Sequence, residues 1–163
     1  METRYLAIDL GAESGRVMLG TLTEDRIILE ELHRFANLPL ENKGSLALDL
    51  DCLTREIKAG LTKAGQLGLS IDSVSVDSWG VDYVLLDQAG AIMPPAFHYR
   101  DPRNKAAAEE IRRSIAWEEI YEETGIQFTA FNTLFQLAAE EPGRLQEASL
   151  ILPIADALNH LLS

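Results

Sequence analysis

The residues best suited to chemistry lie near the start of the chain, in the stretch YLAIDLGAESGRVMLGTL from Tyr5 to Leu22. A carboxylate, Asp9, ends one apolar run, and a short loop bounded by two glycines follows before Arg16 opens a second apolar run. Glycines let main-chain N–H groups approach an anion closely, Ser14 adds a hydroxyl donor, and Arg16 adds positive charge. Asp9 could hold a hydrated Mg²⁺ nearby, because hard cations prefer carboxylate oxygen and water. The pattern therefore suits a phosphate and metal site at a strand end.

Two common phosphate-binding motifs do not fit this loop. The sequence G-x-x-x-x-G-K-[ST] and the dinucleotide fingerprint both lead into a helix, whereas the segment from Gly11 to Gly15 encloses three residues and leads into a strand. A purely structural interpretation is equally open, in which Asp9 caps a turn and the glycines only satisfy its geometry. Glu13 opposes a phosphate site unless its carboxylate points to solvent or toward a metal. The residues of the loop alone are compatible with both a phosphate site and a purely structural turn.

The composition limits the classes of partner. Asp and Glu number 26 against 14 Lys and Arg, a formal charge of -12, so we expect no surface for binding nucleic acid or an anionic membrane. No run reaches the roughly 18 apolar residues that a membrane span needs. The single Cys52 can form neither an internal disulfide nor a thiol zinc site. We therefore expect a cytoplasmic protein that binds neither nucleic acid nor a membrane.

Three apolar runs joined by short polar turns must position the loop. They are Tyr5 to Leu10, Arg16 to Leu22 and Arg26 to Phe35. Short connections favour antiparallel pairing, so these runs predict an N-terminal antiparallel meander. A chain of 163 residues with 47% hydrophobic residues is long enough to bury one substantial core, which predicts one domain.

Helices and further strands follow the meander. Apolar residues recur every four positions from Leu53 and predict a helix of about four turns, with Asp51 as N-cap and glycines at its end. The other predicted elements are strands from Ile71 to Asp77 and Val81 to Leu86 paired as a hairpin, helices over Arg103 to Arg113 (capped by Asp101), Trp117 to Glu123 and Asn132 to Glu141, a return strand from Leu150 to Pro153, and a final apolar helix. The fold class is therefore α/β with a mixed sheet and flanking helices. Because the final helix stops without a polar tail, we expect the chain to be the first part of a longer protein.

Four stretches, in order along nearly the whole chain, resemble the start of the FGGY family of carbohydrate kinases. They are the loop described above, VDSWGVDYVLLDQAG, PPAFHYRDPRN and GIQFTAFNTLFQL. The resemblance implies a ribonuclease-H-like domain of the actin and hexokinase type, which closes with a second, related domain around a cleft. The sugar is then expected largely against the first domain and ATP largely against the second. Residues 1–163 would form an incomplete N-terminal sugar-binding domain that lacks the C-terminal nucleotide-binding domain.

The resemblance also implies roles for individual residues. The loop that reaches the ATP phosphates is matched by Ala12, Glu13, Ser14, Gly15 and Arg16, and Asp9 is expected beside the metal, through water. Gly80 matches a main-chain position that contacts a ketose, and the further candidate neighbours of the sugar are Trp79, Asp82 and Arg100.

Plain structural roles compete with these assignments. Trp79 could be a core or lid residue, Asp82 and Asp77 could face solvent on a strand, and Arg100 could simply pair with Asp101. Phe131 could pack on the apolar face of a sugar ring, although core packing is the expectation. The three histidines, His33, His98 and His160, are far apart in the sequence and receive no role.

Transfer of a phosphoryl group to a sugar hydroxyl also needs a carboxylate that accepts the hydroxyl proton. The resemblance places this base in a His-Asp-Thr stretch, which does not occur in residues 1–163, so no catalytic residue is assigned here. The expected activity of the complete protein is phosphorylation of L-rhamnulose at its 1-hydroxyl with ATP and Mg²⁺, in rhamnose catabolism, and the fragment alone is expected to be inactive. Two alternatives stay open: a kinase for L-fuculose or a related ketose, and a non-catalytic half-domain that binds sugar or nucleotide. A homodimer is also expected, because a domain cut within its core exposes apolar surface.

Overall fold

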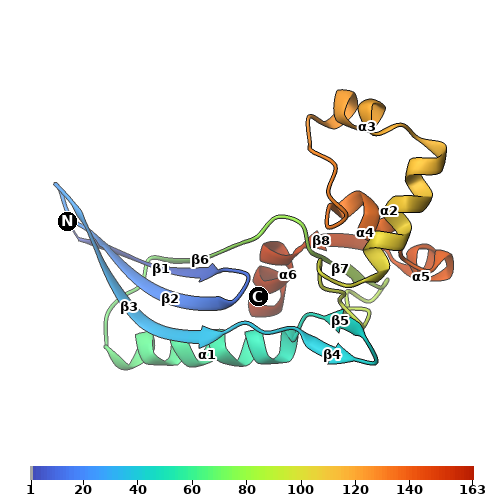
Figure 1. The fold of residues 1–163 in the computed structure, drawn as a ribbon. Helices are drawn as coiled ribbons and strands as arrows, with labels where there is room; N and C mark the ends of the chain where they lie inside the picture. The colour runs from blue at the N-terminus through green and yellow to red at the C-terminus, as the bar shows by residue number, and fades with distance from the viewer. Residues whose placement is uncertain (1) are drawn as a thin grey trace. The chain divides into compact units, whose positions relative to one another are not determined.

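The computed structural model describes residues 2–163, which fall into two compact units. The first unit contains the chain up to Leu38, Asp49–Gly80 and Ile154–Ser163. The second unit contains Pro39–Leu48 and Val81–Pro153. The elements of both units are labelled in Figure 1. Each unit has strand pairing and buried side chains of its own.

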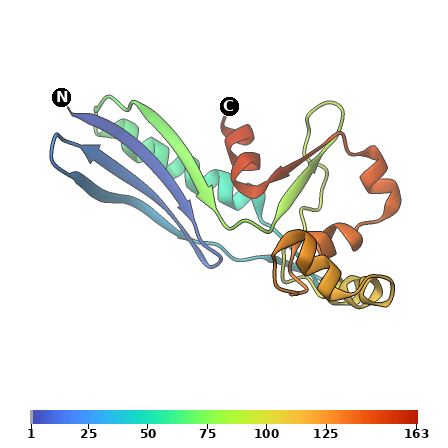
Figure 2. The ribbon, with the colours of Figure 1, turned by 90° about the horizontal axis from the view of Figure 1, so that it is seen from above.

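A four-stranded mixed sheet, in the order β3-β2-β1-β6, forms the centre of the first unit. The strands β1 (Thr3–Leu10), β2 (Ser14–Leu22) and β3 (Ile27–Ala36) pair antiparallel, which confirms the predicted meander. The strand β6 (Ser73–Ser78) runs parallel to β1. Figure 2 shows these four strands side by side from above. The mixed sheet that the sequence predicted is therefore present.

Helix α1 (Leu50–Gln66) lies along one face of this sheet (Figure 1). Its predicted apolar positions Leu53 and Ile57 are 1% and 0% exposed, as the four-residue spacing requires. A side chain at Gly60 would place its Cβ 2.4 Å from Cγ2 of Val17 on β2, so glycine lets the helix approach the sheet closely. The N-cap is Asp49, whose side chain accepts a hydrogen bond from the main-chain N–H of Cys52 at 2.9 Å. The prediction of Asp51 as the cap was therefore wrong by two residues.

The predicted second hairpin is also wrong. β7 (Tyr83–Leu86) does not pair with β6 but with β8 (Leu150–Pro153), antiparallel and in the second unit. Every residue of β7 is buried, whereas most of β6 is exposed. Adjacent strands in a sequence often form hairpins, but a strand buried on both sides needs covering layers that only distant segments provide.

The second unit contains a small hairpin that the sequence analysis missed. β4 (Leu40–Asn42) and β5 (Ser45–Ala47) are joined by Lys43 and Gly44, whose φ angles are 52° and 84°. Positive φ at both turn positions is typical of the tight turns that match the twist of a two-stranded ribbon.

The helices largely follow the predictions. In the second unit these are α2 (Arg103–Ser114), α3 (Trp117–Thr124), α4 (Thr133–Ala138) and α5 (Pro142–Glu147). α4 ends earlier than predicted, and Pro142 begins a separate helix, because proline suits a first helical turn. The final helix α6 (Ile154–Leu162) packs against β6 in the first unit. Within residues 2–163, no helix combines the length and apolar character needed to cross a membrane.

A buried ionic cluster holds the second unit together. The carboxylate of Glu140, whose side chain is 3% exposed, accepts hydrogen bonds from Arg103 at 3.1 Å and Arg144 at 3.0 Å. The hydroxyl of Tyr83 donates to the same carboxylate at 2.9 Å. Burial, followed by the charge of Glu140, raises the pKa of Tyr83 well above its usual value. Arg144 also donates to the carbonyls of Met93 and Pro95, both at 2.7 Å, so the cluster joins β7, α2, α5 and the segment that contains these two carbonyls.

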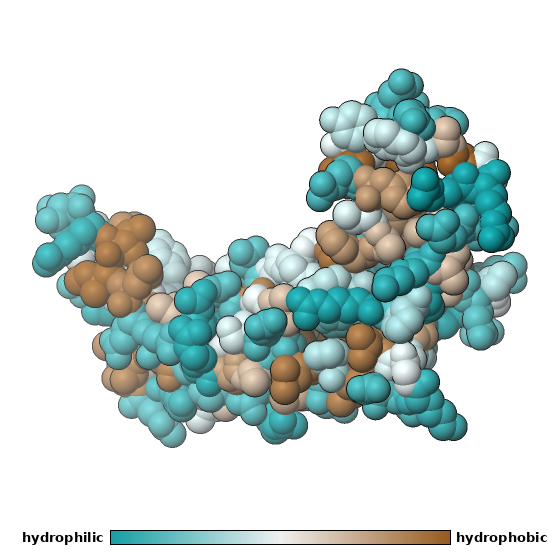
Figure 3. Space-filling model, in the orientation of Figure 1, coloured by the Kyte–Doolittle hydropathy of each residue, from teal (hydrophilic) through white to brown (hydrophobic). Residues whose placement is uncertain are grey.

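Apolar side chains are exposed at one end of the first unit. Ile27 and Leu29 on β3 are 65% and 67% exposed. Figure 3 shows apolar surface over the end of the sheet where β2 and β3 are joined. This surface has the character of a contact site.

Candidate functional site

The loop from Gly11 to Glu13 connects the ends of β1 and β2, and two of its three carbonyl groups accept hydrogen bonds inside the protein. The carbonyl of Gly11 accepts from the side chain of Asn37 at 2.8 Å, and the carbonyl of Glu13 accepts from the main-chain N–H of Asn37 at 2.9 Å. Within residues 2–163, the N–H groups of Ala12 and Glu13 donate no hydrogen bond. Glu13 is exposed, as a phosphate site requires of a second carboxylate.

The structure gives Gly11 and Gly15, which bound the loop, structural roles that the sequence analysis did not expect. The N–H of Gly11 donates to the carbonyl of Ser14 at 2.8 Å, so it closes the turn and is not available to an anion. A Cβ on Gly15 would lie 2.3 Å from the ring of Phe35 and 2.8 Å from Leu10, which leaves no room for a side chain. The structure thus explains Gly15 by packing, and its contact with phosphate stays a prediction.

Asp9 lies in a row of charged residues that crosses the sheet on the face opposite α1. Strand register aligns Asp77 on β6 with Asp9, Asp9 with Arg16, and Arg16 with Arg34 on β3. Residues aligned in this way point to the same face. The carboxylate of Asp9 accepts a hydrogen bond from the guanidinium of Arg16, and both side chains are about two-fifths exposed, at 43% and 41%. In the same row Arg34 pairs with Glu31, which lowers the pKa of Glu31 mainly through their hydrogen bond.

The charge of Arg16 is therefore balanced by Asp9. A polyphosphate that reaches this loop would meet free main-chain N–H groups and an arginine already paired with a carboxylate. Because the pair is partly exposed, it is weak enough for a charged ligand to rearrange. The loop offers part of an anion site and leaves the rest of the charge neutralisation to other groups.

The donor set around Asp9 suits a metal that keeps most of its waters. Among the described residues, no group of three or more His, Cys, Asp or Glu side chains is placed to hold a metal ion. The carboxylate aligned with Asp9 is that of Asp77. Mg²⁺ in phosphoryl-transfer sites keeps several waters and is held by one or two carboxylates together with phosphate. The residues present fit such a hydrated ion and do not form a site of protein ligands alone.

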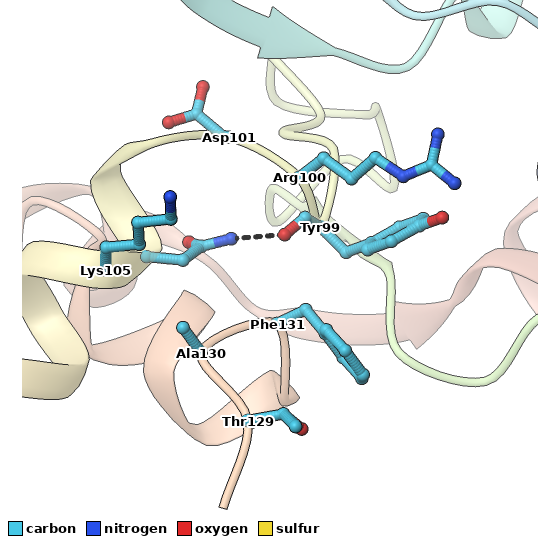
Figure 4. A pocket seen from close by; sticks show the side chains of 8 residues that line it. Tyr99, Arg100, Asp101, Lys105, Thr129, Ala130 and Phe131 are labelled. Carbon is cyan, nitrogen blue, oxygen red and sulfur yellow. Dashed lines mark hydrogen bonds between the residues drawn. The ribbon is translucent and has the colours of Figure 1, made fainter.

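A second candidate region is an open pocket in the second unit, shown in Figure 4. Its volume is about 410 Å³. It lies between the turn before α2 and the loop before α4, and it is lined by Tyr99, Arg100, Asp101, Asn104, Lys105, Thr129, Ala130 and Phe131. The side chains of Tyr99, Arg100 and Phe131 extend in the same direction in Figure 4. We call this the Tyr99–Phe131 pocket.

Its aromatic and cationic groups lie close to one another. The rings of Tyr99 and Phe131 meet edge to face at 6.0 Å between centroids, and the guanidinium carbon of Arg100 lies 5.1 Å from the centroid of the Tyr99 ring. Phe131 is 42% exposed, so the expectation that it packs in the core was wrong. Aromatic faces suit the apolar face of a sugar ring, and a guanidinium is a strong donor to hydroxyl oxygens. The pocket can therefore take a small polyhydroxylated molecule.

Buried polar residues fix the turn that carries Tyr99 and Arg100. Asp101 is 4% exposed and accepts from Ser45 Oγ and Leu46 N, both at 2.6 Å, and from Arg103 N at 2.8 Å. Burial by itself raises the pKa of Asp101, but these hydrogen bonds and the charge of Arg103 outweigh it and leave the pKa below its usual value. The N-cap of α2 is Pro102 and not Asp101, so the predicted cap was wrong by one residue, although the carboxylate of Asp101 does bind the first N–H of the helix. Within residues 2–163 this carboxylate binds the groups named above and forms no ion pair with Arg100, which was the alternative from the sequence.

His98, which received no role from the sequence, also supports this turn. Its ring is 2% exposed, and its Nδ1 accepts from the N–H of Arg100 at 3.1 Å. Burial, followed by the charge of Arg100, lowers the pKa of His98, so the ring is neutral at physiological pH.

The four predicted neighbours of the sugar are divided between the two units. Trp79 and Gly80 follow β6 in the first unit, and Gly80 is exposed, with no heavy atom within 4 Å of the place that a Cβ would occupy. Asp82 and Arg100 belong to the second unit, where Asp82 is 1% exposed and Arg100 lines the Tyr99–Phe131 pocket. The burial of Asp82 rules out the solvent-facing alternative.

Sequence reasoning missed several residues that the structure brings to these regions. They are Tyr99, Asn104 and Lys105 in the pocket and Asn37 behind the loop. The aromatic-basic run HYRDPRN signalled the pocket, since it places aromatic and cationic residues at a helix start. No sequence pattern pointed to Asn37, because the strands β2 and β3 separate it along the chain from its partners Gly11 and Glu13.

The sequence of the chain is similar to those of known carbohydrate kinases. The model of the FGGY family of carbohydrate kinases, N-terminal domain, matches residues 4–163. Similar curated proteins include rhamnulokinases from Mannheimia succiniciproducens, 43% identical over 96% of this chain, and from Enterococcus faecalis, 42% identical over 98%. These alignments cover 34% and 32% of the two relatives, so the chain spans about a third of their length.

Solved structures support the fold. Gluconate kinase from Lactobacillus acidophilus aligns with 97% of this chain and 32% of its own, with a TM-score of 0.80 and 12% identity. Xylulose kinase from the same organism aligns with 96% of this chain and 32% of its own, with a TM-score of 0.79 and 12% identity. The expected fold of the actin and hexokinase type is confirmed by these neighbours. Since the family model covers residues 4–163, nearly the whole sequence, this chain belongs to the FGGY family of carbohydrate kinases.

Proposed function

We propose that residues 1–163 form the N-terminal sugar-binding part of a longer kinase that phosphorylates L-rhamnulose at its 1-hydroxyl with MgATP. The observation that carries this proposal is the 40–43% identity, along almost the whole chain, to three proteins named rhamnulokinase. The described loop and pocket support it, because one offers main-chain donors to an anion and the other offers aromatic and cationic groups to a small polyol.

The loop residues Ala12, Glu13, Ser14, Gly15 and Arg16 are proposed to contact the ATP phosphates. Ala12 and Glu13 contribute N–H groups that donate no hydrogen bond within residues 2–163. Asp9 would hold the waters of a bound Mg²⁺, and that ion would neutralise phosphate charge during transfer. The Asp9 carboxylate also orients the guanidinium of Arg16 near the loop. Since the proton-accepting base is expected beyond Ser163, the isolated chain is proposed to be inactive.

The sugar is proposed to contact Gly80, Trp79, Asp82 and Arg100. Arg100 would donate to hydroxyl oxygens, while the faces of Tyr99 and Phe131 would pack on the apolar side of the molecule. Gly80 would let the main chain approach the ketose closely, because it has no side chain to keep the ligand away.

The test is a steady-state assay of the complete kinase with L-rhamnulose, L-fuculose and other ketoses. We expect the highest kcat/KM with L-rhamnulose. Gly80→Ala is expected to raise the KM for the ketose about tenfold, a typical effect of a misplaced methyl group in a binding site. The matched control is Gly143→Ala, since neither glycine has a neighbour within 4 Å of its Cβ position.

Other outcomes would point elsewhere. A preference for L-fuculose would replace the substrate and keep the kinase. Absence of turnover with any ketose, together with ATP binding, would favour a non-catalytic half-domain function. An unchanged ketose KM in Gly80→Ala would remove Gly80 from the sugar site.

A further inference from the structure

We propose that Asn37 is a positioning residue that holds the loop of Gly11 to Glu13 with its N–H groups facing a phosphate ligand. The inference rests on the proposed kinase function and adds a residue that the motif of the loop does not include. Asn37 directly follows β3 and is 7% exposed. Its side-chain amide donates to the carbonyl of Gly11 at 2.8 Å, and its main-chain N–H donates to the carbonyl of Glu13 at 2.9 Å.

These two bonds determine the direction of the peptide groups in the loop. A trans peptide is planar, and its N–H points opposite to its carbonyl. Because Asn37 binds the carbonyl of Gly11, the N–H of Ala12 in the same peptide group points away from Asn37. The N–H of Ser14 points away in the same manner, since Asn37 also binds the carbonyl of Glu13.

Two of the three carbonyls of the loop are thus used inside the domain, while main-chain N–H groups are left for a ligand. The carbonyls of Gly11, Glu13 and Ser14 all accept hydrogen bonds from main-chain or side-chain groups of the first unit. The N–H groups of Ala12 and Glu13 donate none within residues 2–163. Successive unpaired N–H groups form a concave surface that attracts anions. Asn37 therefore favours the arrangement in which the loop presents donors.

The amide of Asn37 is suited to this task in a way that similar side chains are not. Aspartate has the same shape but would bring a carboxylate oxygen against the carbonyl of Gly11, where two acceptors repel each other. Alanine would leave the carbonyl without its donor. In both variants the main-chain bond from residue 37 to Glu13 can persist, so the sheet keeps its pairing.

The experiment uses the complete kinase with Asn37→Asp and Asn37→Ala. We expect the KM for MgATP to rise about fivefold or more, which corresponds to the loss of one buried hydrogen bond. We expect the KM for the ketose to stay within about twofold of the wild type, because the loop lies outside the proposed sugar contacts. Calorimetric titration with a non-hydrolysable ATP analogue and Mg²⁺, without sugar, should show the same increase in Kd. The matched controls are Asn42→Asp and Asn42→Ala on exposed β4, for which both constants should stay as in the wild type.

Several results would overturn the proposal. They are an unchanged Kd for the analogue, a parallel rise in the KM of ATP and ketose, and failure of both Asn37 variants to fold, as seen by near-ultraviolet circular dichroism. The failure of the proposed function has a different signature. In that case the wild type itself would bind no ATP analogue or turn over no ketose.

Discussion

Replacement of Gly15 by alanine tests whether this glycine is required by packing. The Cβ of alanine would lie 2.3 Å and 2.5 Å from two ring carbons of Phe35 and 2.8 Å from Cδ2 of Leu10. Carbon atoms in ordinary contact are about 3.5–4.0 Å apart, so at least one neighbour must move by roughly an ångström. Phe35 and Leu10 are 8% and 2% exposed, and neither can swing into solvent.

The expected cost of Gly15→Ala is about 3 kcal/mol of unfolding free energy, the upper end of the range for overpacked cores. For a chain of this size, this loss corresponds to a decrease in Tm of roughly 6–12 °C. Urea unfolding followed by circular dichroism measures the free energy, and thermal unfolding measures Tm. Gly143→Ala is the control, because a Cβ meets open space there, and it should not lower the stability, since alanine favours a helix more than glycine does.

A double mutant tests whether the clash with Phe35 is the reason for a glycine at position 15. Phe35→Leu shortens the side chain that the new Cβ would strike, so Gly15→Ala should cost less in the Phe35→Leu background, with a coupling of about 1–2 kcal/mol. If the two substitutions are additive, the clash with Phe35 does not explain the glycine. A cost of Gly15→Ala below about 0.5 kcal/mol in the wild-type background would reject the packing argument altogether.

Three further predictions concern the buried cluster, the acid dependence and the exposed apolar surface. Glu140→Gln should destabilise the chain by about 3 kcal/mol, because two largely buried guanidinium groups lose their counter-charge; urea unfolding measures this, and an equal effect of exposed Glu141→Gln would contradict it. The folded pKa of Asp101 lies below its usual value, so its stabilising contribution is present above the unfolded pKa and is lost as the pH falls through the folded pKa. Asp101→Asn should therefore flatten the acid side of a profile of stability against pH, and a profile parallel to the wild type would argue against this role. The isolated chain should form dimers that Ile27→Lys combined with Leu29→Lys disrupts, because these exposed side chains form an apolar contact surface; sedimentation velocity showing monomers at all concentrations would exclude it.

The two candidate regions differ in how far apart their residues lie in the sequence. The loop after Asp9 is a local feature, and its residue types already suggested an anion. The Tyr99–Phe131 pocket joins two segments that are far apart in the sequence, and Phe131 in its sequence context looked like a core residue. A pocket wall and a core residue share the same apolar side chain, so only the three-dimensional packing separates them.

Features that depend on near neighbours could be predicted from the order of residues. Apolar runs joined by short polar turns predicted β1, β2 and β3, and the four-residue spacing from Leu53 predicted α1. The order of four motifs predicted the family that the comparison confirms. The local pattern did not determine the helix cap, because Asp49 and Asp51 offer the same chemistry two residues apart, and the structure shows Asp49 at the cap.

Contacts between segments that are far apart in the sequence could be identified only from the folded structure. The fold pairs β7 with β8 and not with β6, buries Asp82, and places Asn37 behind the loop. It also explains Gly15 through the ring of Phe35, which belongs to the neighbouring strand. Such contacts depend on the whole set of packed neighbours. The sequence around a residue therefore does not reveal a partner that lies many residues away. For this reason local residue types were enough to propose a phosphate and metal role for Asp9 to Arg16, whereas the contacts that give the loop its shape became visible only in the fold.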